Sequence, residues 1–381
     1  MFINFWYVAA ESKSLADEPL HLTMLGQEFV LFRDSKGIAR CLSNVCTHRG
    51  GSLAHGKIKG DCIECPYHGW QFNADGYCTH IPSIGKDAKI PGRAKVDAYP
   101  TQEKYGLVFA FLGDLPEEER PPIVDVSEWG QDGWRATCGV FEWDFNYQRS
   151  IENGIDPGHN EFTHSTHISV PEGKNWTIPD IDFKSNEWGG EASFSLPGQA
   201  LKDEKWRQES GKSQPGRVDM LMAYHGISTL KTHIDLTEEF HSHQYLFDTP
   251  IDENHTRITL LSMRNFLLDP ADDDRCNERS WFVAVEDRVV LEPLRPVQPP
   301  ALNNREVFVP ADAPIAHYRK RVAEWQAKGW RIDSEEVERN SLKVAYAIPS
   351  PARREHKGWV LDAIPLIEAE SEVALPRISV V

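Results

Sequence analysis

The chain lacks a long hydrophobic run, an excess of basic residues and a nucleotide-binding glycine motif, and each absence excludes a class of protein. No apolar stretch approaches the roughly 20 residues that a membrane-spanning helix needs. Lys and Arg number 41 against 58 Asp and Glu, and a net charge of −17 argues against nucleic-acid binding, which requires a basic surface. No Gly-x-Gly-x-x-Gly motif follows an expected strand, so the sequence gives no indication of an NAD or FAD site.

Cysteines are few and odd in number, which argues against a disulfide framework. Seven are present in 381 residues, and we expect reduced, mostly buried thiols in a reducing compartment. The first residues lack the basic start and long apolar run of a signal peptide. These features predict a cytoplasmic protein, and the length predicts roughly two to three domains.

Two short loops each combine a cysteine with a histidine. The spacing is Cys46-x-His48, sixteen residues, then Cys65-x-x-His68, with glycines beside both loops. Two thiolates and two imidazoles suit one zinc ion or a [2Fe–2S] cluster with both cysteines on one iron and both histidines on the other. A zinc finger groups like ligands together, whereas each loop here carries one of each. We therefore interpret the motif as a Rieske cluster site, with a structural zinc knuckle as the alternative.

The hydrophobic pattern changes character along the chain. Residues 1 to about 115 alternate in β-hairpin fashion, and a charged, proline-bracketed stretch at 116–122 predicts a surface crossing. We place the domains at 1–130 and 131–381. In the second domain the pattern predicts a strand at 134–145, short helices at 146–153 and 157–164, strands through 180–266, helices at 277–294 and 314–330, and an irregular tail.

A second candidate metal site lies after the first predicted helix of this domain. A non-heme ferrous site needs two imidazoles and one carboxylate on one face of the metal, and His159 and His164 can supply the imidazoles. Asp156 precedes His159 by three residues, so on a helix its carboxylate would accept the second ring N–H. His167 is a rival ligand at helical spacing from His164. For His-x4-His alone, two ordinary histidines would be the better interpretation; the cluster motif earlier in the chain favours ligands.

The carboxylate ligand must come from elsewhere in the chain. Asp287 lies inside a mostly apolar predicted helix, where an unpaired acid is costly to bury. Glu286 and Glu292 compete with it, and periodicity alone does not choose among the three. Pairing of Asp287 with a nearby arginine is the non-metal alternative.

With these motifs together, the sequence resembles the α (oxygenase) subunits of the Rieske non-heme iron oxygenases. The resemblance rests on the two loops, on Asn153-x-x-Asp156-x-x-His159-x4-His164 and on Glu286-Asp287. It implies an α+β chain: an N-terminal all-β Rieske [2Fe-2S] domain and a C-terminal helix-grip catalytic domain, an antiparallel sheet around a long helix. It also selects Asp287 as the third ligand of a mononuclear iron.

The resemblance assigns two further roles. Asp156 would bridge a mononuclear-iron histidine to the Rieske histidine His68 of a neighbouring subunit in a homotrimer. Asn153 would lie close to the iron without ligating it. Both are implied by the family, not by the spacing of this sequence.

The expected function is therefore that of an oxygenase component. It would use O2 and electrons from a separate ferredoxin or flavin reductase, ultimately from NAD(P)H, to hydroxylate or oxidatively demethylate a small aromatic or alicyclic substrate. A cis-dihydroxylating ring dioxygenase is an alternative, as are a Rieske electron carrier without oxygenase activity and a zinc hydrolase. Residues 200–266 are expected to line the substrate pocket, although Met220, Met222, Tyr224 and Phe266 are individually better explained as core. The histidines at 225, 233, 241 and 243 are expected to be structural or pocket-lining.

Overall fold

The computed structural model describes residues 1–85, 88–164, 181–197, 217–300 and 305–369. Its contacts divide the chain into two compact units. The first unit contains Met1–Ile123, Thr249–Glu253 and the described residues from 325 to 369, and the second contains Val124–Asp248 and Asn254–Glu324. The division at residue 130 stays a prediction of the domain boundary. The predicted second domain includes the tail after residue 325, whereas the described part of this tail groups with the first unit.

The first unit is built from small antiparallel sheets, as the alternating pattern predicts. β11 forms the middle of a three-stranded sheet, and all six of its side chains are buried because other parts of the unit cover both of its faces. A second sheet has the order β2-β3-β4-β9, in which β2 and β3 are joined by a tight turn at Leu25-Gly26. The strands of these sheets are β1 Phe5–Glu11, β2 Leu20–Met24, β3 Gln27–Arg33, β4 Ala39–Ser43, β9 Ala98–Tyr99, β10 Thr101–Lys104 and β11 Leu107–Leu112.

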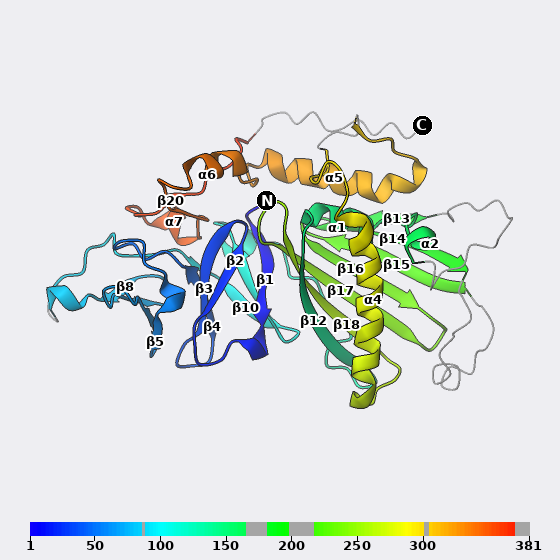
Figure 1. Cartoon of the computed structure of the whole chain (residues 1–381), viewed down its shortest axis with the longest axis horizontal. Coiled ribbons are helices and arrows are strands. Elements are labelled where there is room, and N and C mark those ends of the chain that lie inside the picture. Colours follow the sequence, from blue (N-terminus) through cyan, green and yellow to red (C-terminus); the bar gives the residue numbers. More distant parts are fainter. Residues whose placement is uncertain (86–87, 165–180, 198–216, 301–304, 370–381) are drawn as a thin grey trace. The chain divides into compact units, whose positions relative to one another are not determined.

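A third sheet of this unit holds the two cysteine–histidine loops (Figure 1). Its strands run in sequence order as β5 Lys57–Lys59, β6 Cys62–Glu64, β7 Gln71–Asn73 and β8 Cys78–His80. One loop enters β5 and the other joins β6 to β7. Both loops are anchored because Cys46 and Cys65 belong to a buried core with Ile63 and Phe72.

The tail of the chain is more ordered than its sequence pattern indicated. Asp97, which is fully buried, accepts hydrogen bonds from Ser350 and Arg353, and the Arg353–Asp97 ion pair measures 2.7 Å. Phe5 packs edge-on against Trp325. These contacts explain why the tail groups with the first unit. Its elements are α5 Ala313–Ala327, which begins in the second unit, α6 Ser334–Asn340, α7 Ala352–Glu355 and the parallel pair β19 Tyr346–Ala347 and β20 Asp362–Ala363.

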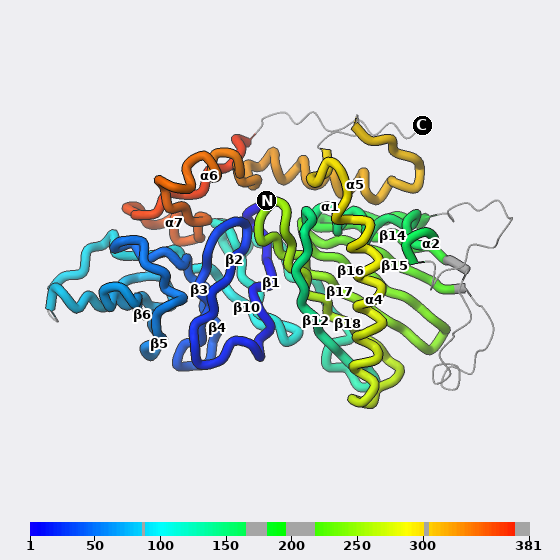
Figure 2. The backbone as a smooth tube through the Cα atoms, viewed as in Figure 1, coloured from blue at the N-terminus to red at the C-terminus, as the bar shows by residue number. Residues whose placement is uncertain are grey.

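The second unit is organised by one seven-stranded sheet, whose strands lie side by side in Figure 2. The spatial order is β12-β18-β17-β16-β15-β14-β13, so β12, the first strand of the unit, pairs with β18, the last. Every pairing with a described register is antiparallel. The strands are β12 Arg135–Trp143, β13 Asp182–Ser185, β14 Gly189–Pro197, β15 Arg217–His225, β16 Thr229–Asp235, β17 His241–Pro250 and β18 Thr256–Arg264.

One long helix packs on a face of this sheet. α4 Asp273–Leu291 begins with two acidic residues, which favour the positive end of a helix dipole, and places Ala284 and Leu291 in a core with Phe141, Trp143, Ile258 and Leu260. Before it come α1 Tyr147–Gly154, capped by the side chain of Asn146, and the single turn α2 Asn160–Thr163. A sheet packed on a long helix confirms the expected α+β helix-grip class. Among the described residues, no helix combines the length and the apolar composition that crossing a bilayer requires.

Candidate metal centres

The two loops of the first unit are built in the same way. In one, the Cys46 N–H donates to the Gly51 carbonyl and the Gly50 N–H donates to the Cys46 carbonyl, at 2.8 and 2.9 Å. In the other, Cys65 and Gly69 repeat the pattern, at 2.8 and 3.0 Å. Gly50 and Gly69 have φ values of +73° and +68°, which side chains rarely adopt. The paired geometry presents two thiols and two imidazoles to one region.

The cysteines and histidines of these loops differ in solvent exposure. Both cysteines are buried, whereas His48 and His68 are exposed, with ring centroids 4.4 Å apart. A Cβ added to Gly51 would lie 3.0 Å from the Cys65 sulfur, a tight contact that would press on this sulfur. Burial, with a smaller effect from Cys65, raises the pKa of the Cys46 thiol to about 12. The buried Cys46 thiol needs a nearby cation to be held as a thiolate, and a second buried cysteine faces the same region, so the residues present fit the cluster.

A second group of ligand types converges in the second unit. His159 and His164 flank the short helix α2, and Asp287 projects from α4. The two Nε2 atoms lie 3.3 Å apart, and Asp287 Oδ1 lies 3.2 Å from that of His164 and 3.7 Å from that of His159. The three ligand atoms all lie within 4.8 Å of one another. Two imidazoles and one carboxylate are therefore gathered around one point.

Each histidine is oriented through its other ring nitrogen. His159 Nδ1 donates to the main-chain carbonyl of Asp156 at 2.7 Å, and His164 Nδ1 donates to Glu286 Oε2 at 2.9 Å. When both rings are neutral, both Nε2 atoms carry lone pairs that face each other and a carboxylate oxygen. Acceptors that converge without a proton between them repel unless a cation is present, so this donor set fits a metal ion.

The surroundings give the two imidazoles different charge preferences. Burial lowers the pKa of His159. Burial also opposes protonation of His164, but its hydrogen bonds to Asp287 and Glu286 outweigh that effect and raise its pKa. The Asn153 side chain donates to Asp287 Oδ1 at 2.9 Å, which restrains the carboxylate beside the imidazoles.

Asp156 differs from the expectation based on helical spacing. Its carboxylate accepts from the Gly158 N–H at 2.7 Å, and its main-chain carbonyl, not its carboxylate, contacts His159. The reason is local: residues 155–159 form turns, and helix α2 begins only at Asn160, so the three-residue helical spacing does not apply. Its carboxylate is therefore not the partner of His159 within the chain.

Other residues singled out from the sequence lie in different surroundings. Glu286, a competing ligand in the sequence, contacts the second nitrogen of His164 instead, and His167 lies outside the described residues. Met220 and Met222 are buried in a core with Phe194. The sequence interpretation missed Trp70, whose ring stacks on His48 at 4.5 Å and 7°. Its position two residues after His68 was the available signal.

Two family models match the chain and together cover most of both units. Residues 5–100 match the Rieske [2Fe-2S] domain, and residues 143–328 match the vanillate O-demethylase oxygenase C-terminal domain. These define the class: an iron–sulfur domain joined to an oxygenase catalytic domain.

Curated relatives and solved structures agree with this class. The iron–sulfur subunit TsaM1 of the toluene-4-sulfonate monooxygenase system of Comamonas testosteroni is 35% identical over 172 residues, 45% of this chain and 49% of the relative. The oxygenase component of dicamba O-demethylase from Stenotrophomonas maltophilia is 26% identical over 81% of this chain and 90% of the relative. The crystal structure of dicamba monooxygenase bound to 3,6-dichlorosalicylic acid shares the fold, with a TM-score of 0.72 at 23% identity, over 84% of this chain and 96% of that one.

The two domains and these relatives establish the family. The chain belongs to the Rieske non-heme iron oxygenases, as an α (oxygenase) subunit. It spans about half the length of several of its curated relatives, including TsaM1 and the phenoxybenzoate dioxygenase α subunit of Ectopseudomonas oleovorans.

Proposed function

We propose that this chain is the oxygenase component of a multicomponent system that hydroxylates or oxidatively demethylates a small aromatic or alicyclic compound. One oxygen atom of O2 would enter the substrate and the other would leave as water, with two electrons and two protons consumed. The observation that carries the proposal is the convergence of His159, His164 and Asp287 around one point. A face of two imidazoles and one carboxylate leaves coordination positions open, which is typical of oxygen-activating ferrous sites.

The proposed site residues are of two kinds: those that bind the metal centres and those that orient the metal ligands. Cys46, His48, Cys65 and His68 are the proposed cluster ligands, and His159, His164 and Asp287 the proposed iron ligands. When bound, the cluster supplies single electrons and the ferrous iron activates dioxygen.

The orienting groups act through the ligands. Glu286 holds His164 in the tautomer that leaves Nε2 free, and the Asp156 carbonyl does the same for His159. Asn153 restrains Asp287 from the side, as a non-ligand.

Demethylation or monooxygenation is favoured over ring dihydroxylation. The C-terminal family model carries the name of vanillate O-demethylase, and a relative matched over 90% of its own length is named an O-demethylase. A ring dioxygenase is the second candidate, because phenoxybenzoate dioxygenase subunit alpha is also a relative, at 33% identity over 49% of both chains.

Electrons would come from a separate ferredoxin or flavin reductase that uses NAD(P)H. We propose a homotrimer in which the Asp156 carboxylate of one subunit meets His68 of the next. The exposure of His68 supports this, because an exposed cluster histidine is accessible to a neighbouring subunit. The seven free cysteines support a reducing, cytoplasmic location.

Oxygen uptake tests the proposal directly. The purified chain with NADH alone should not turn over, whereas addition of a Rieske-type reductase should give oxygen uptake that depends on a substrate from a panel of methoxylated and N-methylated aromatics. Formaldehyde release would identify demethylation, and a cis-diol would identify the dioxygenase alternative. Reduction of the cluster without substrate-dependent uptake across a broad panel would favour an electron carrier and contradict the proposal.

The subunit bridge can be tested separately with Asp156→Asn. We expect both metals to stay bound and coupled turnover to fall below detection, because the neutral amide would no longer pair with the neighbouring His68. Single-turnover reoxidation of the reduced cluster in the presence of substrate measures the transfer. Asp144→Asn, at an exposed position of the same unit, is the control. Normal product formation by Asp156→Asn would refute the bridging role.

A further inference from the structure

A second set of two histidines and one carboxylate lies on the other face of the catalytic sheet. His233 of β16 and His243 of β17 are direct cross-strand partners. Leu246 of β17 lies three residues from His243 and packs into the core against α4, so the alternation of side chains places His243 on the opposite face. This set is therefore separated by the sheet from the group around Asp287, which belongs to α4.

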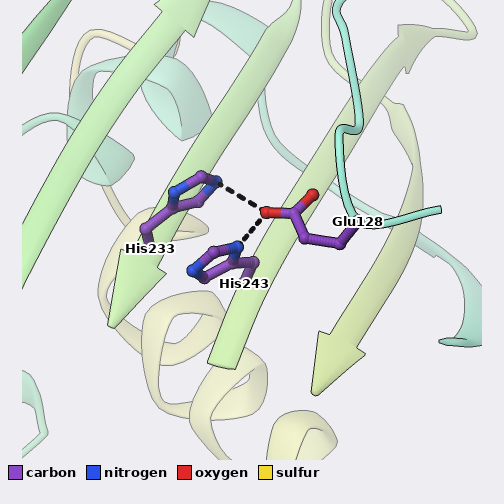
Figure 3. Close-up of side chains that lie close together, drawn as sticks. All are labelled: Glu128, His233 and His243. Carbon is purple, nitrogen blue, oxygen red and sulfur yellow. Dashed lines mark hydrogen bonds and ion pairs between the residues drawn. The ribbon is translucent and has the colours of Figure 1, made fainter. Parts of the chain in front are cut away.

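The carboxylate of the set comes from a segment that crosses this face. Glu128 lies in a pair of consecutive turns before β12, in which the Trp129 and Gln131 N–H groups donate to the carbonyls of Val126 and Glu128. Its Oε1 accepts from His243 Nδ1 and lies 3.8 Å from His233 Nε2 (Figure 3). Both imidazoles thus aim a nitrogen at the same oxygen, although the carboxylate has two.

The set is well enclosed. The side chains of Glu128, His233 and His243 are 6%, 17% and 12% exposed. The ring of Trp134 lies against His243, with centroids 4.9 Å apart. Tyr245 donates to the second Glu128 oxygen at 2.9 Å and also lies 3.1 Å from His233 Nε2. A buried tyrosine that holds the outer oxygen of the carboxylate is the kind of partner that orients a metal ligand.

The two imidazole rings face each other without exchanging a hydrogen bond. Their centroids are 3.5 Å apart and their planes differ by 2°. The ligand atoms of the three side chains all lie within 4.8 Å of one another. His243 and Tyr245 each donate to one oxygen of the carboxylate, and His233 Nε2 also reaches the Tyr245 hydroxyl, yet both imidazoles direct a nitrogen toward the same oxygen, Oε1.

We propose that Glu128, His233 and His243 bind a divalent transition-metal ion, Zn²⁺, as a structural site independent of the oxygenase centre. Two imidazole nitrogens and one carboxylate oxygen are a recurrent zinc ligand set, and imidazole ligands disfavour Ca²⁺ and Mg²⁺. Binding would require the neutral tautomers with the proton on Nε2 of His243 and on Nδ1 of His233, and the two rings would have to turn from parallel so that His243 Nδ1 and His233 Nε2 reach one ion. Bound there, the ion ties the 124–134 crossing to strands β16 and β17.

A neighbouring set competes for the same histidine. Asp235, His241 and His243 also bring their ligand atoms within 4.8 Å, with His241 Nδ1 2.6 Å from Asp235 Oδ1. That set is more open, because the Asp235 and His241 side chains are 48% and 29% exposed. The enclosed set is favoured, and His241 serves as the discriminating control.

The test measures zinc bound by the full chain, with its iron–sulfur cluster in place, after equilibrium dialysis against Zn²⁺ and removal of free ion. An Asp287→Ala background prevents zinc from occupying the mononuclear site. We expect one zinc per chain to remain in this background and Glu128→Gln or His233→Gln to weaken zinc binding by at least about tenfold, since even indirect partners of a metal contribute 10- to 100-fold. His241→Gln and the half-exposed His255→Gln should bind zinc as the background does.

The outcomes separate the alternatives. Absence of retained zinc in the background, or equal zinc affinity in all variants, would overturn the proposal and leave a hydrogen-bonded network. Loss with His241→Gln but not with His233→Gln would overturn it in favour of the neighbouring set. The cluster EPR signal reports that each variant is folded, and zinc-edge X-ray absorption of the background protein should show two imidazole ligands. None of these results bears on oxygen activation at the other face of the sheet.

Discussion

The two faces of the catalytic sheet carry the same ligand types in different settings. On the helical face, His159 and His164 come from a turn and a helix end, and each has a separate orienting acceptor. On the other face, His233 and His243 come from neighbouring strands and share the single carboxylate of Glu128. The first arrangement fixes each imidazole through a separate acceptor, whereas the second is enclosed by Tyr245 and Trp134. Ligand identity alone therefore does not distinguish a reactive site from a structural one.

The largest expected effect is at the helical face, with Asp287→Ala. Loss of the only carboxylate among the three converging groups should abolish mononuclear iron binding and lower substrate-dependent oxygen uptake by more than about a hundredfold, because a direct ligand exceeds an indirect partner in effect. The Rieske EPR signal should persist. Asp274→Ala, exposed on the same helix, is the matched control. Simultaneous loss of the cluster signal would mean that the two centres are not held by separate residues.

A smaller effect is expected from Glu286→Gln, which tests orientation on the same face. Glutamine offers a neutral amide oxygen in place of the carboxylate that accepts the hydrogen bond from His164 Nδ1. We therefore expect iron affinity to fall by about 10- to 100-fold, although all three proposed ligands are unchanged. Iron titration of the apo catalytic site measures this, and Glu278→Gln on the exposed part of α4 should leave the affinity unchanged. An unchanged iron affinity in Glu286→Gln would show that orientation through His164 does not matter.

The smallest effect concerns the attachment of α4 to the sheet. Hydrogen bonds from Arg135 and then Arg264 outweigh burial and lower the pKa of Asp273 to about 2. A carboxylate with a lowered folded-state pKa stabilises the fold above its unfolded pKa of about 3.9, and this stability is lost as pH falls through about 2.

The corresponding variant is Asp273→Asn. It should lower the free energy of unfolding by about 1 kcal/mol at pH 7, after allowance for partial exposure, and the difference from the parent should shrink below pH 4. Chemical denaturation at several pH values measures it. A difference that does not change with pH would argue against the ion pair as its cause.

The sequence predicts local motifs and secondary structure, but it does not predict contacts between residues far apart in the chain. The family and the α+β class are confirmed, and both were predictable because the cluster motif occupies one short stretch of the chain and the strands alternate in hydrophobicity. The assignment of Asp287 rested on the family resemblance, and the site residues stay predictions. Glu128 could not be connected to His233, since this contact depends on sheet register and on a turn about 100 residues earlier.

Two further differences have local physical causes. The Asp156 carboxylate turns to Gly158 because a turn precedes α2, which spacing alone does not reveal. The sequence after the helix predicted at 314–330 indicates an irregular tail because the helices there are short, and the attachment of this tail through Asp97 and Arg353 joins residues 256 positions apart.

Mössbauer spectroscopy of the ⁵⁷Fe-enriched chain tests the central assignment most directly. The account predicts two cluster irons in sulfur- and nitrogen-ligated environments plus one high-spin ferrous iron, and loss of only the last in Asp287→Ala. A parent spectrum with cluster iron alone, or a mononuclear component that survives Asp287→Ala, would contradict it.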